Sequence, residues 1–416
     1  MIKNANQYNF QYDYRVDSQL KIIQLLQNES HPISYLKDKL GISFTATSNI
    51  VNQLIEYGVL VKDEEKTAET KMGRIPLSFK INTALGLTCS IDWSSNQITV
   101  SLNDLNGNIV CRRNVKNQIF IGYKELELTA SLIKEMLKTE EVGNRELLGI
   151  CVSCPGLINK KTEEVAVSFR YLYKENPMPS VYFYNEFGVP VHVYNDLKIS
   201  CLGDMMRGNI PSTANNFCYI YFGASIGSAL FLDGKLYQGS SGYSGEFSFK
   251  YSQDNAFLNK NTLIGFQELC NYVRKKDASL DFEISEFVLD LNKAQKLYDD
   301  NNEIFNEALY EMAMQHALQL IAYNDFLDFD CFFITGDINR FKDRYQEYLM
   351  ENINKFTKLF KPKVYFINQC DNSLSGTIYM ANRHFFLKKL ESIANSNSAN
   401  ASYDIYDSFG DKFNSL

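Results

Sequence analysis

The spacing of apolar residues changes near residue 83, and this change limits the folds that the chain can adopt. Before it, apolar residues recur at helical spacing, as at Ile50, Val51 and Leu54. From Gly86 onward, short alternating runs typical of strands take over, with helical segments between them. Strands that alternate with helices indicate an α/β fold, so we expect a helical head followed by an α/β body.

Residues 1–82 are expected to form the head. Its third helix is predicted to begin at Ser43, whose hydroxyl suits a helix N-cap, and to end at Tyr57 before Gly58. A short strand, a polar loop and a returning strand (77–81) follow this helix. The pattern predicts a winged helix-turn-helix, a fold that binds DNA.

The third helix divides into two faces. The face expected to be buried holds Thr47, Ile50, Val51 and Leu54. The opposite face holds small, polar, uncharged side chains, namely Thr45, Ser48, Asn49 and Asn52. Hydroxyl and amide groups suit base edges and phosphates, whereas a solvated helix usually exposes Lys and Glu. We expect these four residues and Arg74 to contact operator DNA; the alternative is a three-helix protein-interaction module.

Charge and composition limit the possible partners. The pI of 5.4 and net charge of −7 exclude a uniformly basic nucleic-acid binder, and residues 1–83 carry ten Lys and Arg against nine Asp and Glu. A nearly neutral head binds phosphate weakly, so we expect a homodimer or a dimer of dimers. The polar N-terminus resembles no signal peptide, and no apolar run approaches about 18 residues. With nine scattered cysteines that suit reduced core thiols, we expect a cytoplasmic protein without a membrane partner.

Strand and helix patterns divide the body into two lobes. The first lobe is expected over residues 83–195, completed by residues from about 370–390, and the second, larger lobe over 196–369. The Ser- and Asn-rich tail, residues 391–416, is expected to be disordered.

A polar stretch from Asn195 to Glu246 is the candidate ligand site. Asn195 and Asp196 follow a predicted strand, at the end where open α/β sheets bind ligands. A glycine turn and a second carboxylate, Glu246, come later, a combination that suits a polyhydroxylated ligand. The simpler alternative is that Asn195 and Asp196 only cap the helix beginning at Leu197. His192, in the same strand, is expected to be a hydrogen-bonded core residue.

These segments resemble those of the ROK family (repressors, open reading frames and sugar kinases). Asn195–Asp204 is similar to the family's N-D-A-N-x-x-A-x-G-E segment, and Gly223–Glu246 to its G-T-G-I-G…G-x-x-G-E segment. Val152–Gly156 matches its S-x-P-G loop, and the head with Gly73–Pro76 is similar to its repressor branch. The resemblance implies an α/β, two-lobed, actin-like and sugar-kinase-like (ribonuclease H-like) body behind a winged helix-turn-helix.

Departures from the family pattern affect the phosphate and metal sites. The kinase phosphate loop D-x-G-G-T-K falls on Asp92–Gln97, which lacks its glycines and its lysine. Ala224–Ser225 and Gly336–Asp337 replace further phosphate-site glycines. These losses argue against ATP, so we expect no cofactor and no catalysis, with Asp196 a vestigial base candidate. The family's zinc-binding His falls on Phe249, so no metal is expected.

The resemblance also implies ligand contacts. Asn195, Asp196 and Glu246 would meet sugar hydroxyls, and Arg170, which replaces a family Asn, would suit a sugar phosphate or an acid sugar. We therefore expect a DNA-binding transcriptional repressor of carbohydrate metabolism with a sugar or sugar-phosphate effector. The alternatives are an ATP-dependent sugar kinase with an accessory head, and a ligand-blind regulator with a vestigial cleft.

Overall fold

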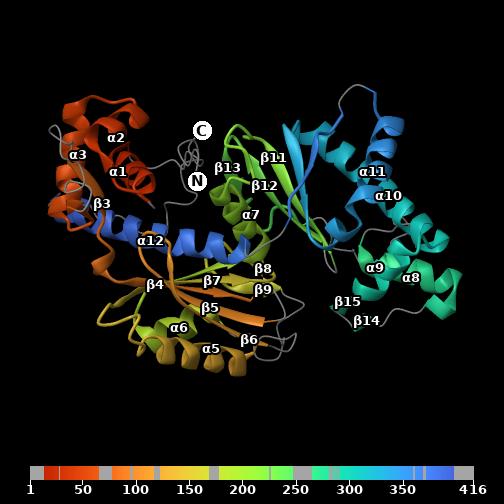
Figure 1. Ribbon diagram of the computed structural model, residues 1–416, viewed down its shortest axis with the longest axis horizontal. Helices are drawn as coiled ribbons and strands as arrows, with labels where there is room; N and C mark the ends of the chain where they lie inside the picture. Colours follow the sequence, from red (N-terminus) through yellow and green to blue (C-terminus); the bar gives the residue numbers. More distant parts are fainter. Residues whose placement is uncertain are drawn as a thin grey trace. The chain divides into compact units, whose positions relative to one another are not determined.

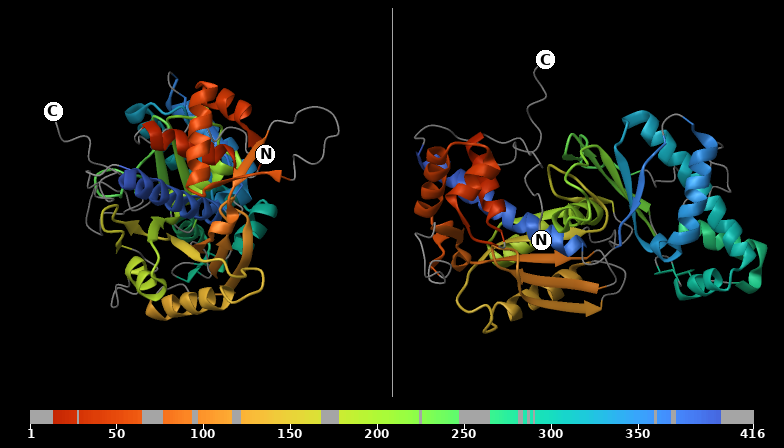
Figure 2. Two further views of the ribbon diagram at one scale, coloured as in Figure 1. Left: turned by 90° about the vertical axis from the view of Figure 1, so that its left-hand side faces the viewer. Right: turned by 45° about the horizontal axis from the view of Figure 1, so that its top comes forward.

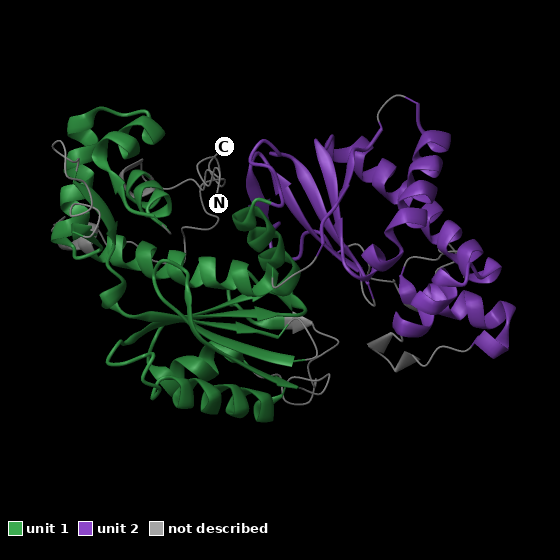
Figure 3. Ribbon diagram, in the orientation of Figure 1, with its two compact units in different colours: residues 1–208, 372–416 green, residues 209–371 purple. Residues whose placement is uncertain are grey.

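The computed structural model describes most of the chain and divides it into two compact units. The first unit comprises residues 1–208 and 372–416, and the second comprises residues 209–371 (Figure 3). The described residues are 14–27, 29–64, 77–93, 97–116, 122–167, 178–223, 226–246, 265–280, 284–285, 288–289, 291–358, 361–368 and 372–397. None of the helices in these ranges combines the length and the apolar character that crossing a membrane requires.

The described part of the head consists of three helices and a small antiparallel sheet of order β1-β3-β2. Its elements are α1 (Tyr14–Leu25), β1 (His31–Pro32), α2 (Ile33–Leu40), α3 (Phe44–Glu56), β2 (Leu60–Lys62) and β3 (Ser78–Ile81). The predicted cap of α3 is confirmed, because Ser43 Oγ accepts a hydrogen bond from the Ala46 amide at 3.2 Å. Lys80 Nζ lies 3.0 Å from Asp63 Oδ1 and joins β3 to the end of β2.

A five-stranded sheet of order β10-β7-β4-β5-β6 forms the body of the first unit (Figure 1). Strands β4, β7 and β10 run parallel, while β5 and β6 complete a meander with β4. The strands are β4 (Leu87–Asp92), β5 (Gln97–Asn103), β6 (Ile109–Lys116), β7 (Leu147–Cys154) and β10 (Val191–Asn195), with the short pair β8 (Leu157–Ile158) and β9 (Val165–Val167) after β7. The helices are α5 (Tyr123–Met136), α6 (Pro179–Phe187), α7 (Asp196–Arg207) and α12 (Asn372–Asn397), and a single 3₁₀ turn, η2 (Thr83–Leu85), leads into β4.

The two faces of this sheet differ in chemistry because successive strand residues point to opposite sides. One face is apolar and packs against α5 and α6, with the ring of Trp93 in the same core. The other face lies under α12 and is polar (Figure 1). There Thr88 Oγ1 donates to Asn382 Oδ1 at 2.6 Å, and Ser373 Oγ donates to Asp92 Oδ1 at 3.0 Å. These hydrogen bonds therefore fix the position of α12 on the sheet.

Helices α7 and α12 approach each other closely at two glycines. A Cβ atom on Gly203 would lie 1.9 Å from the carbonyl oxygen of Asn372, and one on Gly376 would lie 1.9 Å from that of Ile199. Since only glycine permits this distance, α7 belongs with α12. The first segment of the first unit accordingly continues past the expected boundary at residue 195 to Gly208, and the unit resumes at Asn372.

The C-terminal half of α12 forms part of the head's hydrophobic core. Phe386, Leu387 and Leu390 are buried in one cluster with residues of α1, α2, α3 and β3. Gln24 Nε2 of α1 also donates to Tyr379 Oη at 3.0 Å. Figure 2 shows the head helices beside α12 from two further directions. Head and sheet are thus joined through one long helix.

Helix α12 also corrects the predicted tail. It extends to Asn397, so residues 391–397 are helical although we expected disorder from 391 onward. Once a helix is anchored, as α12 is by the buried Leu390, each added residue gains a hydrogen bond at little cost. Residues 398–416 lie outside the described residues.

The second unit is built on a sheet of order β13-β12-β11-β16-β17. Its strands are β11 (Phe217–Phe222), β12 (Ile226–Leu232), β13 (Lys235–Tyr237), β16 (Cys331–Thr335) and β17 (Val364–Phe366), with the small pair β14 (Ile284–Ser285) and β15 (Val288–Leu289) apart from them. Its helices are α8 (Phe266–Lys276), α9 (Leu291–Asp299), α10 (Glu303–Leu327) and α11 (Lys342–Phe356), with 3₁₀ turns η3 (Ala278–Leu280) and η4 (Asp337–Phe341). Helices α8, α10 and α11 bury one apolar core against the sheet.

Candidate functional site

Helix α3 carries the candidate DNA-binding residues on its exposed side. Thr45, Asn49 and Asn52 are exposed, and Ser48 is partly exposed. The predicted opposite face is confirmed at Thr47, Val51 and Leu54, which are buried, while Ile50 is only partly buried. The first turn of α3 carries no acidic residue and its last turn no basic one. Because Glu56 is the one charged residue in α3, the outward face of the helix is nearly uncharged. Arg74 lies outside the described residues.

Asn195 serves mainly as a helix cap. Its Oδ1 accepts hydrogen bonds from the amides of Leu197 at 3.1 Å and Lys198 at 3.0 Å, and its Nδ2 donates to the Gly156 carbonyl at 2.9 Å. This geometry matches the simpler alternative, in which the residue caps the following helix. One amide hydrogen of Asn195 remains beyond these three bonds, since Nδ2 carries two.

Asp196 is the first residue of α7, where the partial positive charge of the helix N-terminus favours a carboxylate. Its Oδ1 accepts a hydrogen bond from the Leu197 amide at 2.9 Å, and its side chain is partly buried. The strand β10 delivers both residues to the carboxyl end of the sheet, beside the end of β7. The position of this pair is the one that the sequence predicts for a ligand site.

Asp92, which begins the phosphate-loop segment, accepts a hydrogen bond from a serine of α12. Ser373 Oγ donates to Asp92 Oδ1 at 3.0 Å and lies 2.6 Å from Ser153 Oγ. All three side chains are buried. Residues 94–96 of the loop lie outside the described residues. Asp92 therefore belongs to the polar contacts that hold α12 on the sheet.

Glu246, on the second unit, follows a constrained glycine. Gly245 has φ +85°, and a Cβ there would lie 2.6 Å from the Ser228 carbonyl oxygen. Ser228 Oγ donates to the Gly245 carbonyl at 2.7 Å, which ties the segment before Glu246 to β12. The Glu246 side chain is partly buried. Arg170, the other proposed ligand contact, lies outside the described residues, as do Ala224 and Ser225.

Tyr221 occupies the space between two glycine turns of the second unit. Its ring atoms lie 2.5 Å from a Cβ built on Gly223 and 2.9 Å from one built on Gly336, and its Oη donates to Asp337 Oδ2 at 3.4 Å. In the kinase pattern these two turns line the nucleotide site. An aromatic side chain fills the gap between them here.

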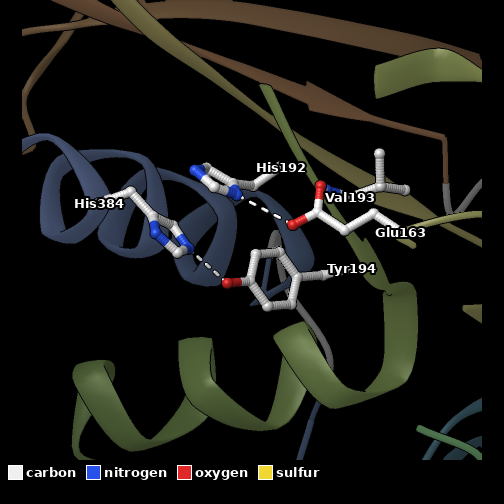
Figure 4. Close-up of polar contacts among 5 residues, drawn as sticks. All are labelled: Glu163, His192, Val193, Tyr194 and His384. Carbon is white, nitrogen blue, oxygen red and sulfur yellow. Dashed lines mark hydrogen bonds and ion pairs between the residues drawn. The ribbon is translucent and has the colours of Figure 1, made fainter. Parts of the chain in front are cut away.

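A polar cluster joins β10 to α12 (Figure 4). The rings of His192 and His384 stack with centroids 3.7 Å apart, and Tyr194 Oη bonds His384 Nε2. His192 Nδ1 lies 3.0 Å from Glu163 Oε1. The other carboxylate oxygen of Glu163 accepts a hydrogen bond from the Val193 amide at 3.3 Å. Burial, followed by the charges of His192 and Arg383, lowers the pKa of His384 well below its usual value. His192 is hydrogen-bonded as predicted, but it is not a core residue, because it lies on the polar α12 face and is partly exposed.

Sequence patterns did not reveal Ser373, Tyr221 or His384 as members of these sites. Their partners lie on distant segments, so no local spacing connects them. A signal was nevertheless present in the last helix. A helix packed in a core usually buries mostly apolar side chains, whereas this helix also buries five polar or charged ones. They are Asn372, Ser373, Thr377, Asn382 and Arg383.

Comparisons with known proteins agree with this architecture. A family model described as ROK family matches residues 88–373. The xylose repressor of Caldicellulosiruptor bescii is 23% identical over 233 residues, which cover 56% of this chain and 57% of that protein. The chain thus spans little more than half the length of this curated relative.

Solved structures show the same fold. A ROK family transcriptional regulator, a homologue of the E. coli MLC protein, superposes with a TM-score of 0.70 at 14% identity, covering 91% of this chain and 98% of the other. A ROK family glucokinase from Streptomyces griseus, solved with glucose and AMPPNP, gives a TM-score of 0.55 at 15% identity, covering 72% and 100%. The glucokinase matches a smaller part of this chain than the regulator does.

Proposed function

Because the chain belongs to the ROK family, we propose that it is a transcriptional repressor of carbohydrate metabolism that binds operator DNA and senses a sugar or sugar derivative. The observation that carries the proposal is the outward face of α3. That face presents short hydroxyl and amide groups, while the opposite face is buried in a core shared with α12. A helix held rigidly with such a face exposed suits the major groove.

The head is proposed to bind DNA as a winged helix-turn-helix. Thr45, Ser48, Asn49 and Asn52 would contact bases and phosphates, and Arg74 would contact the backbone or minor groove beside the wing formed with β2 and β3. A nearly neutral head offers few phosphate contacts, so two heads in a homodimer or a dimer of dimers would supply the affinity that one lacks.

The proposed effector contacts are Asn195, Asp196, Glu246 and Arg170. Of the hydrogen-bonding groups of Asn195, one amide hydrogen remains for a ligand. A relative named xylose repressor makes D-xylose the first sugar to test. Arg170 adds sugar phosphates and acid sugars to the compounds worth screening.

Two contacts favour a sensor over a kinase. Asp92 is held by Ser373, and Tyr221 fills the gap between Gly223 and Gly336. The phosphate-loop segment Asp92–Gln97 also lacks the glycines and the lysine of the kinase pattern. We therefore propose that the chain transfers no phosphoryl group. Incubation with ATP and a panel of sugars should give no ADP; turnover that Asp196→Asn abolishes would establish the kinase alternative.

The DNA-binding proposal is tested by selecting the DNA fragments that the protein retains. Full-length protein is mixed with fragments of its source genome, and retained fragments are sequenced and measured singly. A few fragments sharing a sequence should be retained, and D-xylose or another sugar of the panel should change their affinity. Retention without any effect of the panel would favour the ligand-blind alternative, and no selective retention would refute DNA recognition.

A further inference from the structure

Beside the polar residues Thr45, Ser48, Asn49 and Asn52, the outward face of α3 includes one large apolar side chain. Phe44, the first residue of α3, is 55% exposed. In the described part of the head, only Leu77 among the other large apolar side chains is also exposed, and less so. Phe44 takes no part in the head's core, to which α3 contributes Val51 and Leu54. Folding of the head does not explain this phenylalanine.

The backbone holds Phe44 in a fixed place. Ser43 caps α3 through the Ala46 amide, and Thr47 Oγ1 donates to the Ser43 carbonyl at 3.0 Å, so the first turn is well defined. Phe44 lies one helical turn before Ser48, at the border of the exposed polar face. In a helix-turn-helix, the N-terminal residues of the recognition helix are those that meet base edges.

The neighbours of Phe44 indicate what it contacts. Thr45 and Ser48 are short, so the ring extends beyond them, and no other large apolar residue of the described head lies on this face. Protein interfaces bury contiguous apolar patches, whereas this ring stands alone among hydroxyl and amide groups. In the major groove the one apolar base substituent is the C5-methyl group of thymine, which Phe can contact.

We propose that Phe44 recognises the methyl group of a thymine in each operator half-site. This inference rests on the proposed DNA-binding function and adds to it a base and a residue. The hydroxyl and amide groups of α3 would position the helix by hydrogen bonds, and Phe44 would select thymine at one position. A dimer would make the contact twice, at positions related by the symmetry of the operator.

The test removes the methyl group from the DNA and the ring from the protein. In a fragment retained by wild-type protein, each thymine is replaced singly by deoxyuridine, which keeps the base pairing. Wild-type affinity should fall about fourfold at one thymine per half-site, the factor expected for one lost methyl contact. Phe44→Ala should bind the unmodified fragment more weakly and should no longer distinguish thymine from deoxyuridine at that position. Phe44→Leu should restore part of the discrimination.

A matched control excludes a general effect of losing an exposed ring. Phe326, on α10 of the second unit, is 85% exposed, and Phe326→Ala should keep both affinity and discrimination. Unchanged unfolding midpoints would show that Phe44→Ala is folded. If wild-type protein binds DNA but tolerates deoxyuridine at every position, or if Phe44→Ala keeps the discrimination, the role of Phe44 is refuted while DNA binding stands. If wild-type protein retains no fragment, both proposals fail.

Discussion

Gly203 and Gly376 determine how closely α7 and α12 can pack. Because a Cβ on Gly203 would lie 1.9 Å from a backbone oxygen, Gly203→Ala must push the helices apart. We expect it to lower the free energy of unfolding by about 3 kcal/mol, the upper range for overpacking. Denaturant unfolding followed by the fluorescence of Trp93, the only tryptophan and buried in the first unit, measures the loss.

Gly149 provides the matched control for that substitution. Its Cβ would lie 3.5 Å from the Pro190 carbonyl oxygen, an ordinary contact, and its φ is not positive. Gly149→Ala should therefore change the free energy of unfolding by less than about 1 kcal/mol. Equal effects of the two substitutions would contradict the close helix contact.

His384 should make stability depend on pH in a defined window. Its folded-state pKa is lowered, so below about pH 6.5 the unfolded chain takes up a proton that the folded chain resists. Stability should then fall as pH decreases below 6.5, with a slope of at most about 1.4 kcal/mol per pH unit from this group. In His384→Gln, which keeps polar groups near Tyr194, the slope between pH 6.5 and 5.5 should be smaller. Parallel curves for the two proteins would show that His384 does not titrate in this way.

At the scale of elements, α12 connects the sheet to the head. Leu387 is 6% exposed and lies in the head's core, so Leu387→Ala should destabilise the head by about 2–5 kcal/mol. Amide hydrogen exchange should become faster throughout α1, α2 and α3. Lys388→Ala, at the next, exposed position of the same helix, should leave exchange unchanged. If Leu387→Ala accelerates exchange only within α12, the head does not depend on that helix.

Local sequence patterns predicted the elements well where one segment carries the whole signal. The Ser43 cap, the two faces of α3 and the returning strand of the head, predicted at 77–81 and observed as β3, needed only spacing and capping rules. The position of α12 on the sheet could not be predicted, because the residues that form the contact, Asp92, Ser153 and Ser373, are far apart in sequence. His192 was misjudged for a related reason: alternation shows that a strand has two faces, but not that a polar helix covers one of them.

At the scale of the whole molecule, the candidate ligand site differs from the kinase pattern more than its motifs suggest. The motif residues Asn195 and Asp196 are present, but the structure assigns most of the Asn195 side chain to capping α7. Motifs record which residues are present, whereas hydrogen bonds decide which atoms remain for a ligand.

The central claim is that α3 recognises DNA, and binding of one selected genomic fragment by the Asn49→Ala variant tests it most directly. Alanine favours helix more than asparagine, so the variant should remain folded. Wild-type protein should bind with a Kd of about 10⁻⁸ M or lower, and Asn49→Ala should bind at least about fivefold more weakly. Equal affinities of the two proteins for that fragment would contradict the account.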